Sequence, residues 1–268
     1  MERSYTQEEF RRARKKIVEK LLVPSALRPV DSPTAFLLGG QSGAGKTTLH
    51  GVLRERLDDN VIVINGDEYR AKHPRYREFD REYGPESVNH TAEWAGRMTE
   101  ELIDTLSRKS YNLIIEGTLR TAEVPTKTAT LLRERGYAVS LALMAVKPEI
   151  SLISCQIRYE EMRIAGTVPR ATDPAHHNKI VHDIVRNLAV LEKSGLFDEV
   201  FLYNRARTCL FPREGEGRSA SEVLHEALFG GWTDEERQHK EALEIRLAQL
   251  RARADAREAE ARRRFFER

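Results

Sequence analysis

The most specific chemical pattern in the chain is a glycine-rich run that ends in lysine and threonine. Gly40-Gln-Ser-Gly-Ala-Gly-Lys46-Thr47 matches GxxxxGK[ST], in which glycines let the backbone curl and turn successive N–H groups toward phosphate oxygens. A helix beginning near Lys46 adds its positive dipole end, Lys46 reaches the β- and γ-phosphates, and the Thr47 hydroxyl ligates Mg²⁺. We therefore expect an Mg·ATP site held by Gly40, Gln41, Ser42, Gly43, Ala44, Gly45, Lys46, Thr47 and Thr48.

A first carboxylate follows the apolar run 61–64, in the segment Asn65-Gly-Asp67. At the end of a strand beside the phosphates, the Asp67 carboxylate can accept the proton of an attacking hydroxyl and hold it in line with the γ-phosphate. The alternative is that Asp67 only caps the next turn, 68–70.

A second carboxylate, Glu116, follows the apolar run 113–115. An acid beside a nucleotide is costly unless it binds a metal, the water around it or a substrate hydroxyl. Thr118 and Arg120 add a donor and a cation, and a structural ion pair between Glu116 and Arg120 is the alternative. Together with Asp67, this acid predicts a polar acceptor pocket suited to hydroxyl groups such as those of a sugar.

Three arginines flank a loop that contains glycine and proline, residues 165–169. Arg158 and Arg163 precede it and Arg170 follows it, as in a lid whose guanidinium groups stabilise a transferring phosphoryl group. Each is equally well explained as an exposed helix or loop residue. His176, His177 and His182 lack the spacing of a metal site, and we expect them at the surface or in loop packing.

Five short apolar runs must form the elements that position these side chains. They lack alternation, as buried parallel strands do, and longer segments suited to crossover helices separate them. This order predicts an α/β fold of the P-loop NTPase type, with a parallel sheet flanked by helices and ligands bound beyond the carboxyl ends of the strands. The expected strands are 35–38, 61–64, 113–115, 139–146 and 200–203, and the expected helices are 47–57, 87–108, 126–135 and 180–194.

Both ends of the chain predict further helices. Thr6 to Glu9 fits a capping box ahead of apolar residues at helical spacing, which end at Leu21. From Trp232 the chain is rich in Glu, Arg and Ala, with an apolar stripe at Leu243, Leu247 and Leu250. We expect residues 1–231 to form a kinase domain and 232–268 a long charged helical extension, docked at its start and mostly solvated after residue 252.

Composition narrows the classes of function. In 268 residues, 44 Lys and Arg balance 42 Asp and Glu, so no general basic field for nucleic acid exists. No apolar run is long enough to span a bilayer, and two cysteines cannot form a disulfide scaffold. We expect a cytoplasmic protein that binds neither nucleic acid nor membrane.

The motifs resemble, in order and spacing, those of the zeta toxins, and most closely the PezT-like branch of these bacterial toxin kinases. The resemblance runs from about Phe10 to Trp232 and rests on linked motifs. These are the segments Gly39 to Thr48, Asn65 to Asp67, Ile115 to Arg120, Ile157 to Glu161 and Pro169 to Thr172.

This resemblance implies transfer of phosphate from Mg·ATP or Mg·GTP to the 3′-hydroxyl of the amino sugar in UDP-N-acetylglucosamine, which blocks synthesis of peptidoglycan precursors. It implies that Asp67 is the general base, Lys46 the phosphate clamp, and Arg158 and Arg170 the lid arginines. It also implies a small antitoxin that covers the nucleotide site. The sugar-nucleotide pocket would contain Glu100, Glu116, Thr118, Arg120 and Thr128, of which Glu100 and Thr128 rest on the resemblance alone.

Two other functions remain open at this point. One is a kinase of another small hydroxylated metabolite or an antibiotic, since related phosphate-loop kinases share this layout. The other is a nucleotide-binding regulator or scaffold that works through its helical tail. Asp67, Glu116 and the paired lid arginines argue against the second, because a binding module needs none of them.

Overall fold

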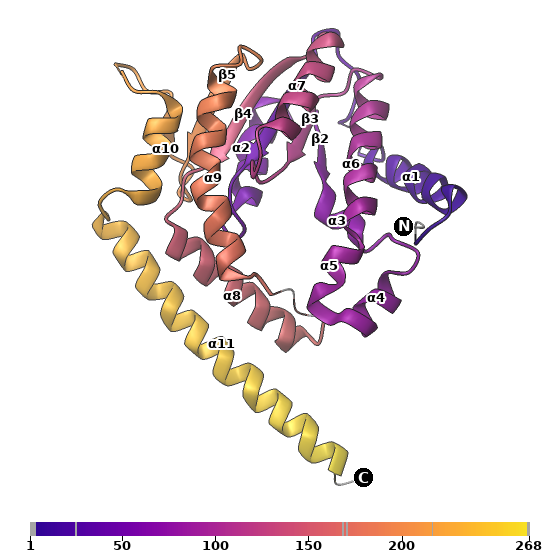
Figure 1. Cartoon of the computed structure of the whole chain (residues 1–268), viewed down its shortest axis with the longest axis vertical. Coiled ribbons are helices and arrows are strands. Elements are labelled where there is room, and N and C mark those ends of the chain that lie inside the picture. The colour runs from indigo at the N-terminus through magenta and orange to yellow at the C-terminus, as the bar shows by residue number, and fades with distance from the viewer. Residues whose placement is uncertain (1–3, 25, 168, 170, 216, 267–268) are drawn as a thin grey trace.

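The computed structural model describes residues 4–24, 26–167, 169, 171–215 and 217–266, which form one sheet covered by helices (Figure 1). The six strands lie in the order β2-β3-β1-β4-β5-β6. The first five are parallel, as predicted, and β6 pairs antiparallel with β5 at the edge. The strands are β1 (Thr34–Gly39), β2 (Ile62–Asn65), β3 (Leu113–Glu116), β4 (Ala138–Met144), β5 (Glu199–Tyr203) and β6 (Cys209–Phe211).

Helices cover both faces of the sheet and correspond in most places to the predicted segments. The predicted helix 87–108 is an exception, because it is divided at Thr91 into two helices, Ser87–His90 and Ala92–Ser107. The helices are α1 (Gln7–Leu21), α2 (Lys46–Arg56), α3 (Gly66–Arg70), α4 (Tyr76–Tyr83), α5 (Ser87–His90), α6 (Ala92–Ser107), α7 (Glu123–Glu134), α8 (Pro148–Ala165), α9 (Pro174–Glu192), α10 (Ala220–Phe229) and α11 (Asp234–Phe266), with a 3₁₀ turn at Gly84–Glu86.

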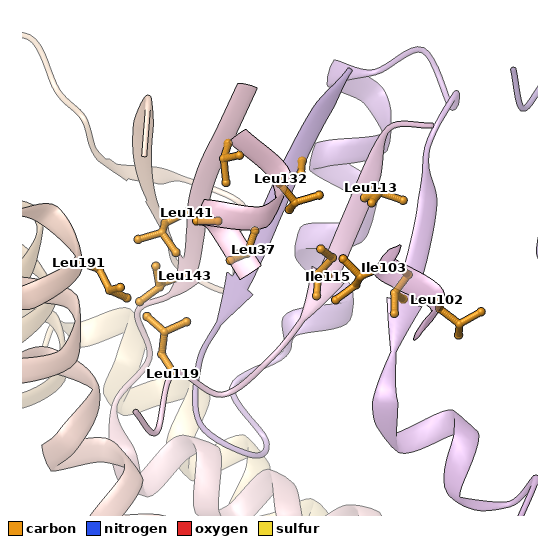
Figure 2. Close-up of a cluster of buried hydrophobic side chains, with 14 of the residues drawn as sticks. Leu37, Leu102, Ile103, Leu113, Ile115, Leu119, Leu132, Leu141, Leu143 and Leu191 are labelled. Carbon is orange, nitrogen blue, oxygen red and sulfur yellow. The ribbon is translucent and has the colours of Figure 1, made fainter. Parts of the chain in front are cut away.

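The core consists of two layers because alternate side chains of each strand point to opposite faces of the sheet. Leu37 of β1 packs with Ile115, Leu141 and Leu143 beneath helices α6, α7 and α9 (Figure 2). Its neighbours Phe36 and Leu38 pack on the other face with side chains of α2 and α8. Burial on both faces explains why these strands read as continuous apolar runs.

The first helix begins as predicted. Thr6 accepts a hydrogen bond from the Glu9 N–H, and the Glu9 carboxylate accepts one from the Thr6 N–H, which completes a capping box. Phe10 is fully buried, with its ring 5.1 Å from that of Trp94 in α6. This edge-to-face contact attaches α1 to the body.

The last helix, α11, runs along α8 and extends past it (Figure 1). A capping box between Thr233 and Glu236 starts it, and Leu247 is buried in the contact. The prediction that the helix is mostly solvated from residue 252 agrees with the described side chains, because residues 251–260 are all exposed except Ala254, which is 2% exposed. None of the helices in the described ranges is both long and apolar enough to cross a membrane.

Candidate nucleotide and acceptor site

The expected site residues follow three neighbouring strands that end in register. Glu116, the last residue of β3, pairs with Leu38 of β1 on one side and with Asn65 of β2 on the other. The phosphate loop, residues 40–47, begins two residues after Leu38, and Asp67 lies two residues after Asn65. Parallel pairing therefore brings the predicted phosphate, base and acceptor residues to one edge of the sheet.

The phosphate loop requires its glycines. Gly40, Gly43 and Gly45 have φ angles of 140°, 76° and 93°, which side chains other than hydrogen rarely allow. A Cβ on Gly43 would lie 2.0 Å from the Ser151 carbonyl oxygen in α8, so the loop also touches that helix closely. Among the described residues, the N–H groups of Gly43, Gly45 and Lys46 donate to no protein acceptor. Free N–H donors at the start of α2 form a nest for anions.

Lys46 occupies the centre of this loop. Its Nζ donates to the carbonyl oxygens of Gly40, at 2.8 Å, and Gln41, at 3.3 Å. Burial lowers the pKa of Lys46, while the charges of Glu116 and Asp67 oppose that shift. Thr47 is exposed and Thr48 half-buried in the first turn of α2. A cation held between loop carbonyls and two acids is positioned to exchange these weak partners for phosphate oxygens.

A series of buried hydrogen bonds between polar side chains supports the phosphate loop. The Gln41 amide donates to the Val146 carbonyl and to the Ser151 hydroxyl, which in turn lies 2.9 Å from His177 Nε2. Of the two places expected for these histidines, the surface or loop packing, His177 takes the second, because it is fully buried and packs beneath the phosphate loop. Its ring links α9 to α8 and to the phosphate loop. His176 and His182 are exposed, and the described residues contain no cluster suited to a metal ion.

Asp67 lies in the first turn of α3, where its carboxylate is 68% exposed. The Arg70 guanidinium donates to it at 2.8 Å and is itself held by the Val88 carbonyl at 2.7 Å. The cap of this helix is Asn65, whose side chain accepts from the Asp67 N–H. Asp67 is thus not needed for capping, and its carboxylate is oriented toward a pairing cation while open to solvent.

Glu116 is more enclosed, with 17% of its side chain exposed. The Asn65 amide donates to its Oε2 at 3.3 Å, and His50 Nε2 lies 3.1 Å from the same atom. The basic side chain beside Glu116 is therefore His50, and among the described residues Glu116 forms no ion pair with Arg120. Sequence reasoning missed His50, although it lies one helical turn after Lys46 on the same face of α2.

The other expected pocket residues lie around this edge without forming one connected cluster. Thr118 is half-buried and Arg120 exposed in the loop after β3. Glu100 of α6 pairs with Lys127 of α7 at 3.4 Å, and both are exposed. The Thr128 hydroxyl donates to the Val124 carbonyl within α7.

The structure distinguishes two of the three candidate lid arginines. Arg158 is exposed on α8, and its charge lowers the pKa of Lys46, so the two cations are near neighbours. Arg163 is instead bound by Glu160, Asp255 and Glu258, which ties α8 to α11. Arg170 lies outside the described residues.

A further arginine at the phosphate loop was not predicted. Arg205 follows β5, and its Nη2 donates to the Gly43 carbonyl and to the Ser154 hydroxyl. It is about 160 positions from the loop along the chain, and nothing in its immediate sequence marks it, so only folding reveals the contact.

Comparison with known proteins identifies the family to which this site belongs. The sequence pattern of the zeta toxin family matches residues 19–216. The chain belongs to the zeta toxin family. It is 44% identical over 247 residues to Toxin PezT of Streptococcus pneumoniae serotype 4, covering 92% of this chain and 97% of that protein. It is 43% identical over 203 residues to Toxin zeta of Enterococcus hirae, covering 75% and 71% of the two chains.

Solved structures support the family assignment. A structure from the PezAT chromosomal toxin–antitoxin system of Streptococcus pneumoniae aligns with a TM-score of 0.84 at 42% identity, covering 93% of this chain and 99% of that one. The AvrRxo1-ORF1:ORF2 complex aligns with a TM-score of 0.53 at 15% identity, which is a likeness of fold alone. The zeta toxin fold predicted from the motifs is therefore confirmed.

Proposed function

We propose that this zeta toxin family member is a kinase that transfers the γ-phosphate of ATP or GTP to the 3′-hydroxyl of the amino sugar in UDP-N-acetylglucosamine. The observation that carries the proposal is the meeting of an anion nest, a half-buried lysine and two carboxylates at one sheet edge. A pure nucleotide-binding scaffold has no use for Asp67 and Glu116 in this position. The resulting product would block peptidoglycan precursor synthesis, which fits the toxin names of the relatives.

The residues divide the chemistry between them. The loop N–H groups and Lys46 bind and orient the polyphosphate, and Arg158 and Arg170 stabilise charge on the transferring phosphoryl group. The Asp67 carboxylate, oriented by Arg70, takes the proton from the sugar hydroxyl. Glu116, which accepts a hydrogen bond from Asn65 and lies beside His50, binds a neighbouring sugar hydroxyl.

A magnesium ion fits the donor set at the start of α2. Thr47 is exposed there, next to the free N–H groups of the loop, so its hydroxyl is available as an oxygen ligand. The ion would neutralise phosphate charge when bound with the nucleotide. Among this chain's residues, we assign its coordination to Thr47.

We further propose that residues 1–231 are the kinase unit, that the protein acts in the cytoplasm and that a small antitoxin covers its nucleotide site. The aligned structure comes from a toxin–antitoxin system, which supports such a partner. Glu100, Thr118, Arg120 and Thr128 would contact the sugar nucleotide beside Glu116.

The test is to incubate the protein with Mg·ATP and UDP-N-acetylglucosamine and to detect phosphorylated sugar nucleotide by mass spectrometry. Asp67→Ala should lower turnover about a hundredfold or more while nucleotide affinity is unchanged, since a general base typically contributes that factor. Glu68→Ala is the matched control, because Glu68 is the adjacent exposed acid of the same short helix. Near-normal turnover in Asp67→Ala would remove Asp67 from the mechanism.

If the wild-type protein binds ATP but yields no phosphorylated sugar nucleotide, the acceptor is instead another hydroxylated metabolite or an antibiotic.

A further inference from the structure

Arg205 is held in place by a tight turn between β5 and β6. The Asn204 N–H donates to the Thr208 carbonyl at 3.1 Å, and the Asn204 side chain accepts from the Thr208 N–H at 2.9 Å. The Arg207 N–H closes the turn on the Asn204 carbonyl. These hydrogen bonds fix the backbone on either side of Arg205. The turn therefore sets the direction of the Arg205 side chain.

The guanidinium of Arg205 reaches the outside of the phosphate loop. Its Nη2 donates to the Gly43 carbonyl and, at 2.8 Å, to the Ser154 hydroxyl. The N–H of the same peptide unit, on Ala44, donates to the Gln41 carbonyl at 3.2 Å. The Gly43–Ala44 peptide is therefore anchored at both ends, which leaves the neighbouring N–H groups of Gly43 and Gly45 free for anions.

The charge of Arg205 has no counterpart in the described parts of the chain. Burial lowers the pKa of the guanidinium, and no carboxylate forms an ion pair with it. Its Nε is enclosed without a hydrogen-bond partner and lies 3.8 Å from the position that a Cβ on Gly45 would take. Arg205 is half-buried, and a partly desolvated cation without an anion is unfavourable, so an external anion at the loop would relieve this cost.

We propose that Arg205 is a positioning residue of the donor site, which holds the Gly43 peptide in its phosphate-binding orientation and whose charge is balanced by the polyphosphate of the bound nucleotide. This inference rests on the proposed nucleotide site but not on the identity of the acceptor. It extends the site to a strand turn on the other side of the loop from Asp67 and Glu116.

The test compares binding of Mg·ATP and Mg·ADP by calorimetry, in the full chain, with thermal unfolding of the free protein. Arg205→Met keeps much of the side-chain volume and removes the charge. The substitution should weaken ATP binding about tenfold or more. It should weaken ADP binding less, because ADP carries fewer phosphate charges and so interacts less strongly with the guanidinium. The unfolding midpoint of the free protein should stay the same or rise, because an unbalanced charge is removed. Arg205→Lys should recover part of the affinity.

The matched control is Arg207→Met, on the same turn. The Arg207 side chain is exposed and lies 4.0 Å from Glu55, so its loss should leave nucleotide affinity unchanged. Equal ATP affinity in the wild type and Arg205→Met would overturn the role of Arg205. So would a lower unfolding midpoint with equal losses of ATP and ADP affinity, which indicates structural support only. Failure of the wild type to bind any nucleotide would overturn the donor site itself, whereas binding without transfer to UDP-N-acetylglucosamine would overturn the acceptor alone.

Discussion

At the scale of single residues, the loop carbonyls stabilise the Lys46 ammonium group while no phosphate is bound. Its ammonium group is enclosed, and its hydrogen bonds go to the carbonyl oxygens of Gly40 and Gln41. Such neutral acceptors are weaker partners than phosphate oxygens. The loop thus holds the ammonium group where it can exchange these carbonyl oxygens for phosphate oxygens, which are stronger hydrogen-bond acceptors.

We expect Lys46→Met to weaken ATP binding by about a hundredfold, because a charge-assisted contact to phosphate is lost from an enclosed site. In the wild type, affinity should also fall as the pH rises toward the lowered pKa of Lys46, since the ammonium then loses its proton below its ordinary range. Calorimetry across a pH series measures both effects. Unchanged affinity in Lys46→Met would contradict the assignment of the phosphate loop.

At the scale of elements, α11 and α8 form the helix pair that holds Arg158. Arg163 of α8 contacts Glu258 at 2.9 Å, Asp255 at 3.0 Å and Glu160 at 2.6 Å. Glu160 is buried, and its other cationic partner, Arg251, is 3.9 Å away. The extension after residue 231 therefore braces the helix that leads into the predicted lid.

Arg163→Ala should lower the unfolding midpoint by about 3 °C or more, because Glu160 would remain enclosed with only a distant partner. Arg246→Ala is the control, since its ion pair with Glu161 joins the same two helices but is largely exposed. Exposed pairs contribute little, so its midpoint should change by about 1 °C or less. Scanning calorimetry of both variants measures the difference. Equal shifts would show that Glu160 does not depend on Arg163.

At the scale of the whole molecule, buried histidines make folding sensitive to acid. Burial lowers the pKa of both His73 and His177, so the unfolded chain binds protons at a higher pH than the folded one. The free energy of unfolding must then decrease as the pH falls below about 6.5, the ordinary histidine value.

His177→Gln should flatten this pH dependence between about pH 7 and pH 5, because one group that protonates mainly in the unfolded state is removed. His176→Gln is the matched control, as the neighbouring side chain is exposed. Urea unfolding at a series of pH values gives the slope for each variant. The same slope in His177→Gln and the wild type would exclude His177 as a source of acid sensitivity.

Local sequence was sufficient for the five parallel strands, the phosphate loop and the acids at the ends of β2 and β3. Apolar runs, glycine spacing and strand ends are properties of short segments, and parallel pairing then brings the ends of different strands to one edge. The short strand β6 was not predicted, because three half-buried residues carry too weak a pattern. The division of the predicted helix 87–108 at Thr91 was not predicted either.

Only the tertiary structure decided which polar residues meet. Arg205 and His177 reach the site from distant segments, and their own neighbours in sequence carry no signal of it, whereas His50 follows Lys46 by one turn of α2. Arg158 and Arg163 lie on one helix and are alike in sequence, yet α11 pairs with one and leaves the other exposed. Such choices depend on how distant elements pack, because the electrostatic partners of an enclosed charge are set by the fold and not by chain neighbours.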